Sequence, residues 1–184
     1  MEIRDEIKKL IEVFKVANDD VIGNVARQIF NFNWKEGLSA RNQAHKVLDE
    51  LTLTNQIKKG KGFYSVKDYQ GEYKEHDRVI ADCIAKLILL KYPISIYRES
   101  SLSNGLRPDV IGLIGKDGKA LCFILEICIS ESDSYLEQKA TFWRHHNPLQ
   151  EVFGIPIPQF TLVVCGKQHP EMMDFENFIE EVQK

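Results

Sequence analysis

Residues 106–130, LRPDVIGLIGKDGKALCFILEICIS, constrain the fold more than any other stretch of this chain. Two apolar runs flank the sequence GKDGK, whose glycines permit a tight reversal, so the stretch predicts two strands joined in a β-hairpin. Two acidic residues interrupt this pattern. Asp109 opens the first strand, and Glu126 lies deep in the second, between Leu125 and Ile127, where burying a carboxylate without a partner is costly.

A hairpin of this length can bring Asp109 and Glu126 together on adjacent strands. Two ionised carboxylates side by side in an apolar sheet repel each other, and one of them would take up a proton. A divalent cation removes that penalty, and paired acidic oxygens suit Mg²⁺ or Mn²⁺. Two alternatives need no metal: Asp109 can cap a turn, and Glu126 can form a buried ion pair with Arg107.

The composition of the chain bounds its class. Its 184 residues are 43% hydrophobic and 28% charged, which suits one globular domain or two small ones. The net charge of -3 gives no overall attraction to nucleic acid, although a local basic patch remains compatible with it. The apolar runs are too short to span a membrane, and the charged N-terminus lacks the apolar core of a secretory signal. We therefore expect a cytoplasmic protein with no membrane partner.

The first part of the chain predicts a small DNA-binding domain. Residues 3–52 have the apolar spacing of three helices, with Asn18 and Ser39 as candidate N-caps of the second and third. A strand, a KKGKG turn and a second strand follow over residues 57–66. Three helices followed by a basic hairpin are the layout of a winged helix-turn-helix, which we assign to residues 1–70.

This segment is locally basic inside an acidic protein. Residues 39–64 hold five lysines and arginines against two acidic residues. The outer face of the third helix can reach base edges in a major groove, and a lysine-rich wing can contact phosphates. The predicted DNA-contacting residues are Arg41, Asn42, Gln43, His45, Lys46, Lys58, Lys59 and Lys61. The alternative is that the winged helix contacts protein, including a second copy of the chain in a homodimer.

The second part, residues 71–184, predicts a domain around a mixed sheet. It begins with a helix over about residues 72–91, which Pro93 ends. Three strands follow, ISIYRES, RPDVIGLIG and KALCFILEICIS, then the helix SDSYLEQKATFWRHH, the strand QFTLVVCG and a final helix. An early hairpin with later alternation of strand and helix predicts an α+β or α/β sandwich, a central mixed sheet flanked by helices.

The order RPDV, about fifteen residues, then ILEIC resembles the PD-(D/E)XK nuclease superfamily, whose fold is restriction-endonuclease-like. The resemblance implies that Asp109 and Glu126 bind Mg²⁺ or Mn²⁺ and that a lysine two residues after the glutamate assists the attacking water. It also implies a third carboxylate on the preceding helix, here Asp77 or Asp82. More narrowly, a winged helix, EHD, RPD, LE and YLEQKATFW are similar to the replication-relaxation family of plasmids and mobile elements, over about residues 20–145.

The sequence departs from the nuclease pattern at one position. Cys128 stands where the lysine of Glu-x-Lys is expected, and a thiol cannot replace an ammonium as a donor. One explanation is that Lys139 reaches the site from the next helix, on which Gln138 would orient the DNA strand. We therefore predict catalytic residues Asp109, Glu126, Lys139 and Gln138, and metal ligands Asp109, Glu126, Asp77 and Asp82.

Two functions follow from these alternatives. The first is a DNA-binding, magnesium-dependent endonuclease, a hydrolase of the PD-(D/E)XK type. The second is a catalytically inactive DNA-binding protein that acts in replication, mobilisation or transcription of a mobile element.

Overall fold

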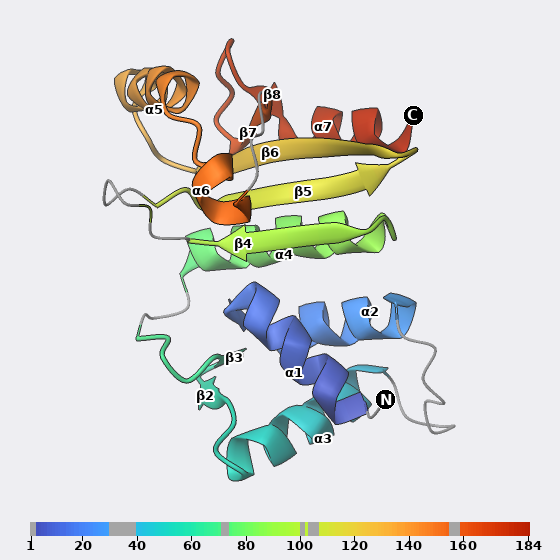
Figure 1. Ribbon diagram of the computed structural model, residues 1–184. Helices are drawn as coiled ribbons and strands as arrows, with labels where there is room; N and C mark the ends of the chain where they lie inside the picture. The colour runs from blue at the N-terminus through green and yellow to red at the C-terminus, as the bar shows by residue number, and fades with distance from the viewer. Residues whose placement is uncertain (1–2, 30–39, 71–73, 100–101, 103–106, 155–158) are drawn as a thin grey trace. The chain divides into compact units, whose positions relative to one another are not determined.

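The computed structural model describes residues 3–29, 40–70, 74–99, 102, 107–154 and 159–184 (Figure 1). These residues form an α+β structure with a three-stranded antiparallel sheet and a five-stranded mixed sheet. The chain divides by its contacts into two units, Met1–Lys91 and Tyr92–Lys184, and each is described by itself. No helix within the described ranges is both long and apolar enough to cross a membrane.

The first unit alternates helices with short strands. Its elements are α1 (Ile3–Phe14), β1 (Val16–Ala17), α2 (Asp19–Ile29), α3 (Ala40–Leu53), β2 (Lys58–Gly60), β3 (Phe63–Ser65) and α4 (Glu75–Leu89). The sheet order is β1-β3-β2, with both pairs antiparallel. The helix α4, which we grouped with the second part of the chain, therefore belongs to the first unit by its contacts.

The predicted helices of this unit form for the reasons that their sequences indicate. Each helix buries one apolar stripe, and Ala44, Leu48 and Leu51 on α3 are fully buried. Asn18 caps α2 as expected, because its Oδ1 accepts a hydrogen bond from the amide of Val21 at 2.9 Å. The predicted hairpin is also confirmed, with β2 and β3 paired in register. Ser39, the predicted N-cap of the third helix, lies outside the described residues.

The second unit contains the larger sheet. Its elements are β4 (Ile94–Arg98), β5 (Val110–Lys116), β6 (Lys119–Cys128), α5 (Asp133–His145), α6 (Leu149–Phe153), β7 (Thr161–Gly166), β8 (Met173–Asp174) and α7 (Phe175–Gln183). The strand order is β4-β5-β6-β7-β8. The first two pairs are antiparallel and the last two are parallel, so the predicted mixed sheet is confirmed.

Helices cover both faces of this sheet. Leu136, Ala140 and Trp143 of α5 pack with alternate sheet residues, including Ile124 of β6, in one buried cluster. The neighbouring residue Phe123 points to the other face, since successive side chains of a strand alternate, and its ring contacts Phe178 of α7. The side chains of Glu126 and Cys128 share the α5 face with Ile124.

The turn between β5 and β6 fixes the register that the site depends on. Asp117 and Gly118 both have positive φ, 51° and 73°, as the two central residues of a tight hairpin turn require. Lys116 therefore pairs with Lys119, and Val110 pairs with Leu125. The hairpin predicted from the sequence is confirmed.

Candidate functional site

The hairpin register places Asp109 and Glu126 beside each other. Because Val110 pairs with Leu125, the next opposed positions are Asp109 and Glu126, on the same face of the sheet. Asp109 is 9% exposed and Glu126 is 1% exposed. The Oδ2 atom of Asp109 accepts a hydrogen bond from the amide of Ile127 at 2.8 Å, which ties the start of β5 to β6. The structure thus brings these two sequence-predicted residues together.

Helix α5 supplies two donors to Glu126. The indole Nε1 of Trp143 donates to Oε1 at 2.6 Å, and the ammonium of Lys139 donates to Oε2 at 2.7 Å. These donors lie one helical turn apart, so they share a face of α5. Ser132 fixes where the helix begins, because its hydroxyl accepts from the amide of Tyr135. The cation beside Glu126 is therefore Lys139, and the alternative ion pair with Arg107, whose side chain is exposed, is not the one that forms.

The site has more negative than positive charge when both acids are ionised. Burial, and then the charge of Asp109, raise the pKa of Glu126 to about 7, although Lys139 opposes the shift. Burial works against the charge on Lys139, but the carboxylate of Glu126 outweighs burial and raises the lysine pKa. The two shifts are compatible because one ammonium faces two carboxyl groups. Near neutral pH the pair therefore favours an additional proton on Glu126.

Cys128 lies on the same face, two residues beyond Glu126. Burial raises the pKa of its thiol to about 12, so the thiol stays protonated at neutral pH and is neither an anionic ligand nor a nucleophile. The ammonium of Lys139, which lies 2.7 Å from Glu126, opposes the effect of burial on the pKa of this thiol. Lys139 is thus beside the position where the expected Glu-x-Lys lysine is missing.

Gln138 lies on a different side of α5. Its exposed side chain lines a shallow pocket of about 380 Å³ together with residues such as Thr141, Phe142 and His145. The turn of an α-helix places it about 200° around the axis from Leu136, which is buried against the sheet. No contact of the described residues joins Gln138 to the two carboxylates, so its role stays a prediction.

The predicted helix carboxylates Asp77 and Asp82 belong to α4, in the first unit. Asp77 is buried and accepts hydrogen bonds from the amide of Lys74 at 3.2 Å and the hydroxyl of Tyr69 at 3.1 Å. Asp82 is half-buried, which raises its pKa, and it pairs with Arg78 at 3.4 Å. Asp77 therefore helps to begin α4, and a role of either residue as a metal ligand stays a prediction.

Two of the predicted DNA-contacting residues connect α3 to the hairpin. The Nδ1 atom of His45 lies 2.6 Å from the hydroxyl of Tyr64. That hydroxyl also donates to Asp49 at 3.1 Å, and Lys59 binds the same carboxylate at 2.7 Å. Lys59, with smaller contributions from Tyr64 and His45, lowers the pKa of Asp49. His45 and Lys59 therefore hold the hairpin against α3.

The other predicted residues differ in exposure. Asn42 and Lys46 are exposed on α3, whereas Gln43 is half-buried. Lys58 and Lys61 are exposed on the hairpin, and Lys58 donates to the carbonyl of Tyr69 at 3.2 Å. The side chain of Arg41 lies outside what the structure describes. Lys46 of α3 and Lys61 of the hairpin are thus exposed members of the set.

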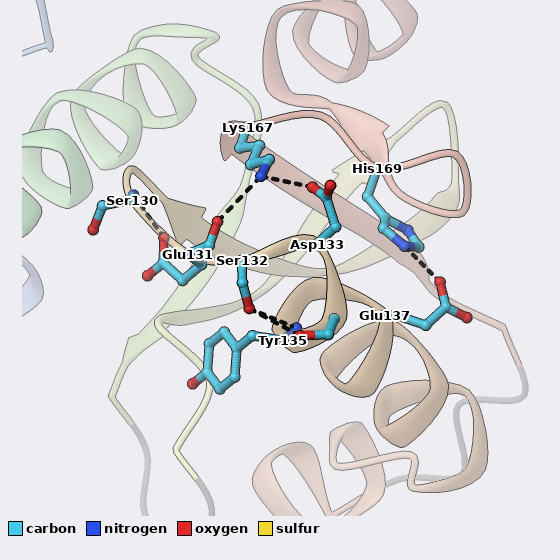
Figure 2. Close-up of polar contacts among 9 residues, drawn as sticks. Ser130, Glu131, Ser132, Asp133, Tyr135, Glu137, Lys167 and His169 are labelled. Atoms are coloured by element: carbon cyan, nitrogen blue, oxygen red, sulfur yellow. Dashed lines mark hydrogen bonds and ion pairs between the residues drawn. The ribbon is translucent and has the colours of Figure 1, made fainter.

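Sequence reasoning missed a group of pairs between α5 and the segment after β7, two of them ion pairs and one a carboxylate–imidazole hydrogen bond. Asp133 pairs with Lys167 at 2.6 Å, Glu137 with His169 at 2.9 Å, and Arg144 with Glu171. Figure 2 shows the first two pairs together with the Ser132 cap. The signal for them was the run of polar and charged residues, KQHPE, that directly follows a strand at residues 167–171. These pairs attach the outer side of α5, whose inner side carries Lys139 and Trp143.

The acidic and imidazole groups at the middle of these ion pairs, Glu137, His169 and Glu171, lie within 4.8 Å of one another. The amide of Glu171 donates to Nδ1 of the imidazole at 3.3 Å. A neutral His169 therefore carries its proton on Nε2 and donates it to Glu137. Arg144 satisfies the carboxylate of Glu171. Protein groups thus account for this cluster without a metal.

Comparisons with known proteins find little. No family model matches the chain, and no curated protein matches its sequence. The structure is similar to that of restriction endonuclease FokI bound to DNA, with a TM-score of 0.30, 12% identity, and coverage of 98% of this chain and 41% of that chain. For FokI without DNA the TM-score is 0.29 and the identity 13%, over 98% and 40% of the two chains. The chain thus spans about two fifths of FokI, and so weak a similarity carries no argument about function.

Proposed function

We propose that this protein binds DNA through an N-terminal winged helix and cleaves it as a magnesium-dependent endonuclease of the PD-(D/E)XK type. One observation carries the catalytic part of the proposal. Asp109 and Glu126 lie side by side at the edge of a hairpin, and the ammonium of Lys139 lies 2.7 Å from Glu126. The same three groups, two acids and a lysine, are what the nuclease resemblance requires.

The winged-helix part is supported by the order of elements in the first unit. Helix, strand, two helices and two strands follow one another, and the last two strands form a hairpin with exposed Lys58 and Lys61. In winged helices the third helix reads the major groove and the hairpin contacts the backbone. Lys46, exposed on α3, is placed on an element that would approach DNA.

The donor set at the hairpin fits Mg²⁺ or Mn²⁺. Asp109 and Glu126 offer carboxylate oxygens, which these hard cations prefer, and together they exceed the charge of the single lysine. The two acids would hold the metal. When bound, it would lower the pKa of a water molecule and stabilise negative charge on the phosphate.

The remaining roles belong to side chains of α5. Lys139 would hold the attacking water or the charge that develops on the phosphate, because its ammonium reaches Glu126 and is partly exposed. Trp143 would hold Oε1 of Glu126 and so fix the orientation of that carboxylate. The ion pairs on the outer side of α5 would keep both side chains in place.

A specific observation favours the second candidate, a catalytically inactive DNA-binding protein of a mobile element. Both oxygens of Glu126 have protein donors, so Lys139 and Trp143 satisfy this carboxylate without a metal. The domain would then keep a buried ion pair in place of a reaction site.

The homodimer stays a prediction as well, and light scattering of the purified protein tests it.

Calorimetry with Mn²⁺, run beside a plasmid-nicking assay, separates the two candidates. The endonuclease binds Mn²⁺ and nicks plasmid DNA, and Glu126→Gln loses both. The inactive protein retards DNA in a gel but shows neither metal binding nor nicking. Glu151→Gln, on the exposed surface of α6, is the matched control and should behave as the wild type.

A further inference from the structure

We infer that Lys139 is a displaceable counter-ion, which occupies Oε2 of Glu126 in the metal-free protein and must give up that oxygen when a divalent cation binds. The inference rests on the proposed metal site at Asp109 and Glu126, and it adds how access to that site is controlled. Lys139 would thus neutralise the site before a metal binds, and metal binding would release its ammonium from Glu126.

The two donors of Glu126 differ in their freedom to move. Trp143 is 3% exposed and packs in the core cluster between α5 and the sheet, so its indole cannot leave Oε1 without opening that core. The side chain of Lys139 is 21% exposed and has a flexible four-carbon stem. Oε2 is therefore the oxygen that can exchange its partner.

Two cations cannot share that oxygen from the same side. The ammonium lies 2.7 Å from Oε2, and a bound Mg²⁺ would lie about 2.1 Å from a carboxylate oxygen. Trp143 already occupies the other oxygen, so a metal that binds Glu126 must compete with the ammonium for Oε2. Repulsion between the charges, together with their overlap in space, makes binding of the metal and of the ammonium mutually exclusive at Oε2.

Tyr135 offers the released ammonium a second partner. It lies one turn before Lys139 on α5, and the centroid of its ring is 5.2 Å from the Nζ atom, within range of a cation–π contact. Tyr135 is 46% exposed, so an ammonium held over its ring would lie close to solvent. A lysine in that position can meet a phosphate oxygen of DNA, which connects metal binding to substrate binding.

The first test compares Mn²⁺ binding to the wild type and to Lys139→Met by calorimetry. Removing the competing ammonium should tighten binding about tenfold or more, because a hydrogen bond to a charged group no longer has to be broken. Lys119→Met is the matched control, since Lys119 is exposed at the turn end of β6, and its Mn²⁺ affinity should equal that of the wild type. Metal binding with unchanged or weaker affinity in Lys139→Met overturns the inference and leaves the metal site standing.

Two other outcomes concern the proposed function. Mn²⁺ binding by Lys139→Met but not by the wild type supports the inference and removes the endonuclease proposal. Absence of binding in both proteins removes the metal site and the inference together.

The second test uses the wild type and does not depend on the variant folding. Its lysines are acetylated briefly with and without saturating Mn²⁺, and the extent at each lysine is measured by mass spectrometry. Mn²⁺ should increase acetylation of Lys139 several-fold while Lys167 stays unchanged. Acetylation of Lys139 that stays the same or falls with bound Mn²⁺ contradicts the inference.

Discussion

The hydrogen bond from Trp143 to Glu126 gives the sharpest prediction for stability. Trp143→Phe keeps an aromatic ring in the core but removes the Nε1 donor, which lies 2.6 Å from a carboxylate that is 1% exposed. A hydrogen bond to a charged group contributes about 1.5–3 kcal/mol, and the smaller ring adds a cavity cost of about 1 kcal/mol. We therefore expect Trp143→Phe to lower the free energy of unfolding by about 2.5–4 kcal/mol at pH 8.

A double-mutant cycle separates the hydrogen bond from the packing. In Glu126→Gln the acceptor becomes neutral, and a neutral hydrogen bond contributes only about 0.5–1.5 kcal/mol. Trp143→Phe should therefore cost about 1 kcal/mol less in the Glu126→Gln background than in the wild type, since the cavity cost cancels. Urea unfolding at pH 8, followed by circular dichroism, measures all four proteins. An equal cost in the two backgrounds would show that Trp143 contributes packing alone, and the reasoning would be refuted.

Three further predictions follow from the other interactions. Because the pKa of Glu126 is raised to about 7 from 4.5, the folded state holds the proton of this carboxyl group more tightly than the unfolded state does. The free energy of unfolding should therefore fall as pH rises from about 4.5 to 7, by up to about 3 kcal/mol. Glu126→Gln should flatten this pH dependence in urea unfolding, and an unchanged slope in the variant would contradict the prediction. The double variant Lys46→Ala with Lys61→Ala should bind duplex DNA more weakly than the wild type. The slope of its log binding constant against log salt concentration should be smaller by about 0.9 for each phosphate that the protein no longer neutralises. Fluorescence anisotropy across salt concentrations measures both effects, and Lys119→Ala should show neither. Tyr64→Phe should lower the free energy of unfolding by about 1–2 kcal/mol by removing the hydroxyl between His45 and Asp49, and a decrease under about 0.3 kcal/mol in urea unfolding would count against that network.

The hairpin shows how much of the site could be predicted from the sequence. An Asp-Gly pair between two apolar runs determines the turn, the turn determines the register, and the register brings Asp109 and Glu126 to opposed positions. Each of these steps is local, so no information about distant residues is required.

The donors from α5 could be predicted only in part. The stripe of Leu136, Ala140 and Trp143 sets which side of the helix faces the sheet, and it places Lys139 at the edge of that side and Gln138 away from it. The sequence therefore held the signal that distinguishes the two residues. That the indole reaches Glu126 depends on how α5 lies over the sheet, which long-range packing decides.

The elements that escaped prediction are all short. β1 and β8 have two residues each, and α6 has five. Two residues cannot show an alternating pattern, and a single turn cannot show a helical one. These elements form because neighbouring strands and helices offer them partners, as β3 does for β1.

Anomalous diffraction from crystals soaked in Mn²⁺ tests the central claim most directly, because it locates the metal. We predict a peak about 2.0–2.3 Å from carboxylate oxygens of both Asp109 and Glu126, with the ammonium of Lys139 moved away from Oε2. Saturating Mn²⁺ with no peak there and Lys139 still on Glu126, or a peak only at Glu137, His169 and Glu171, would contradict that claim.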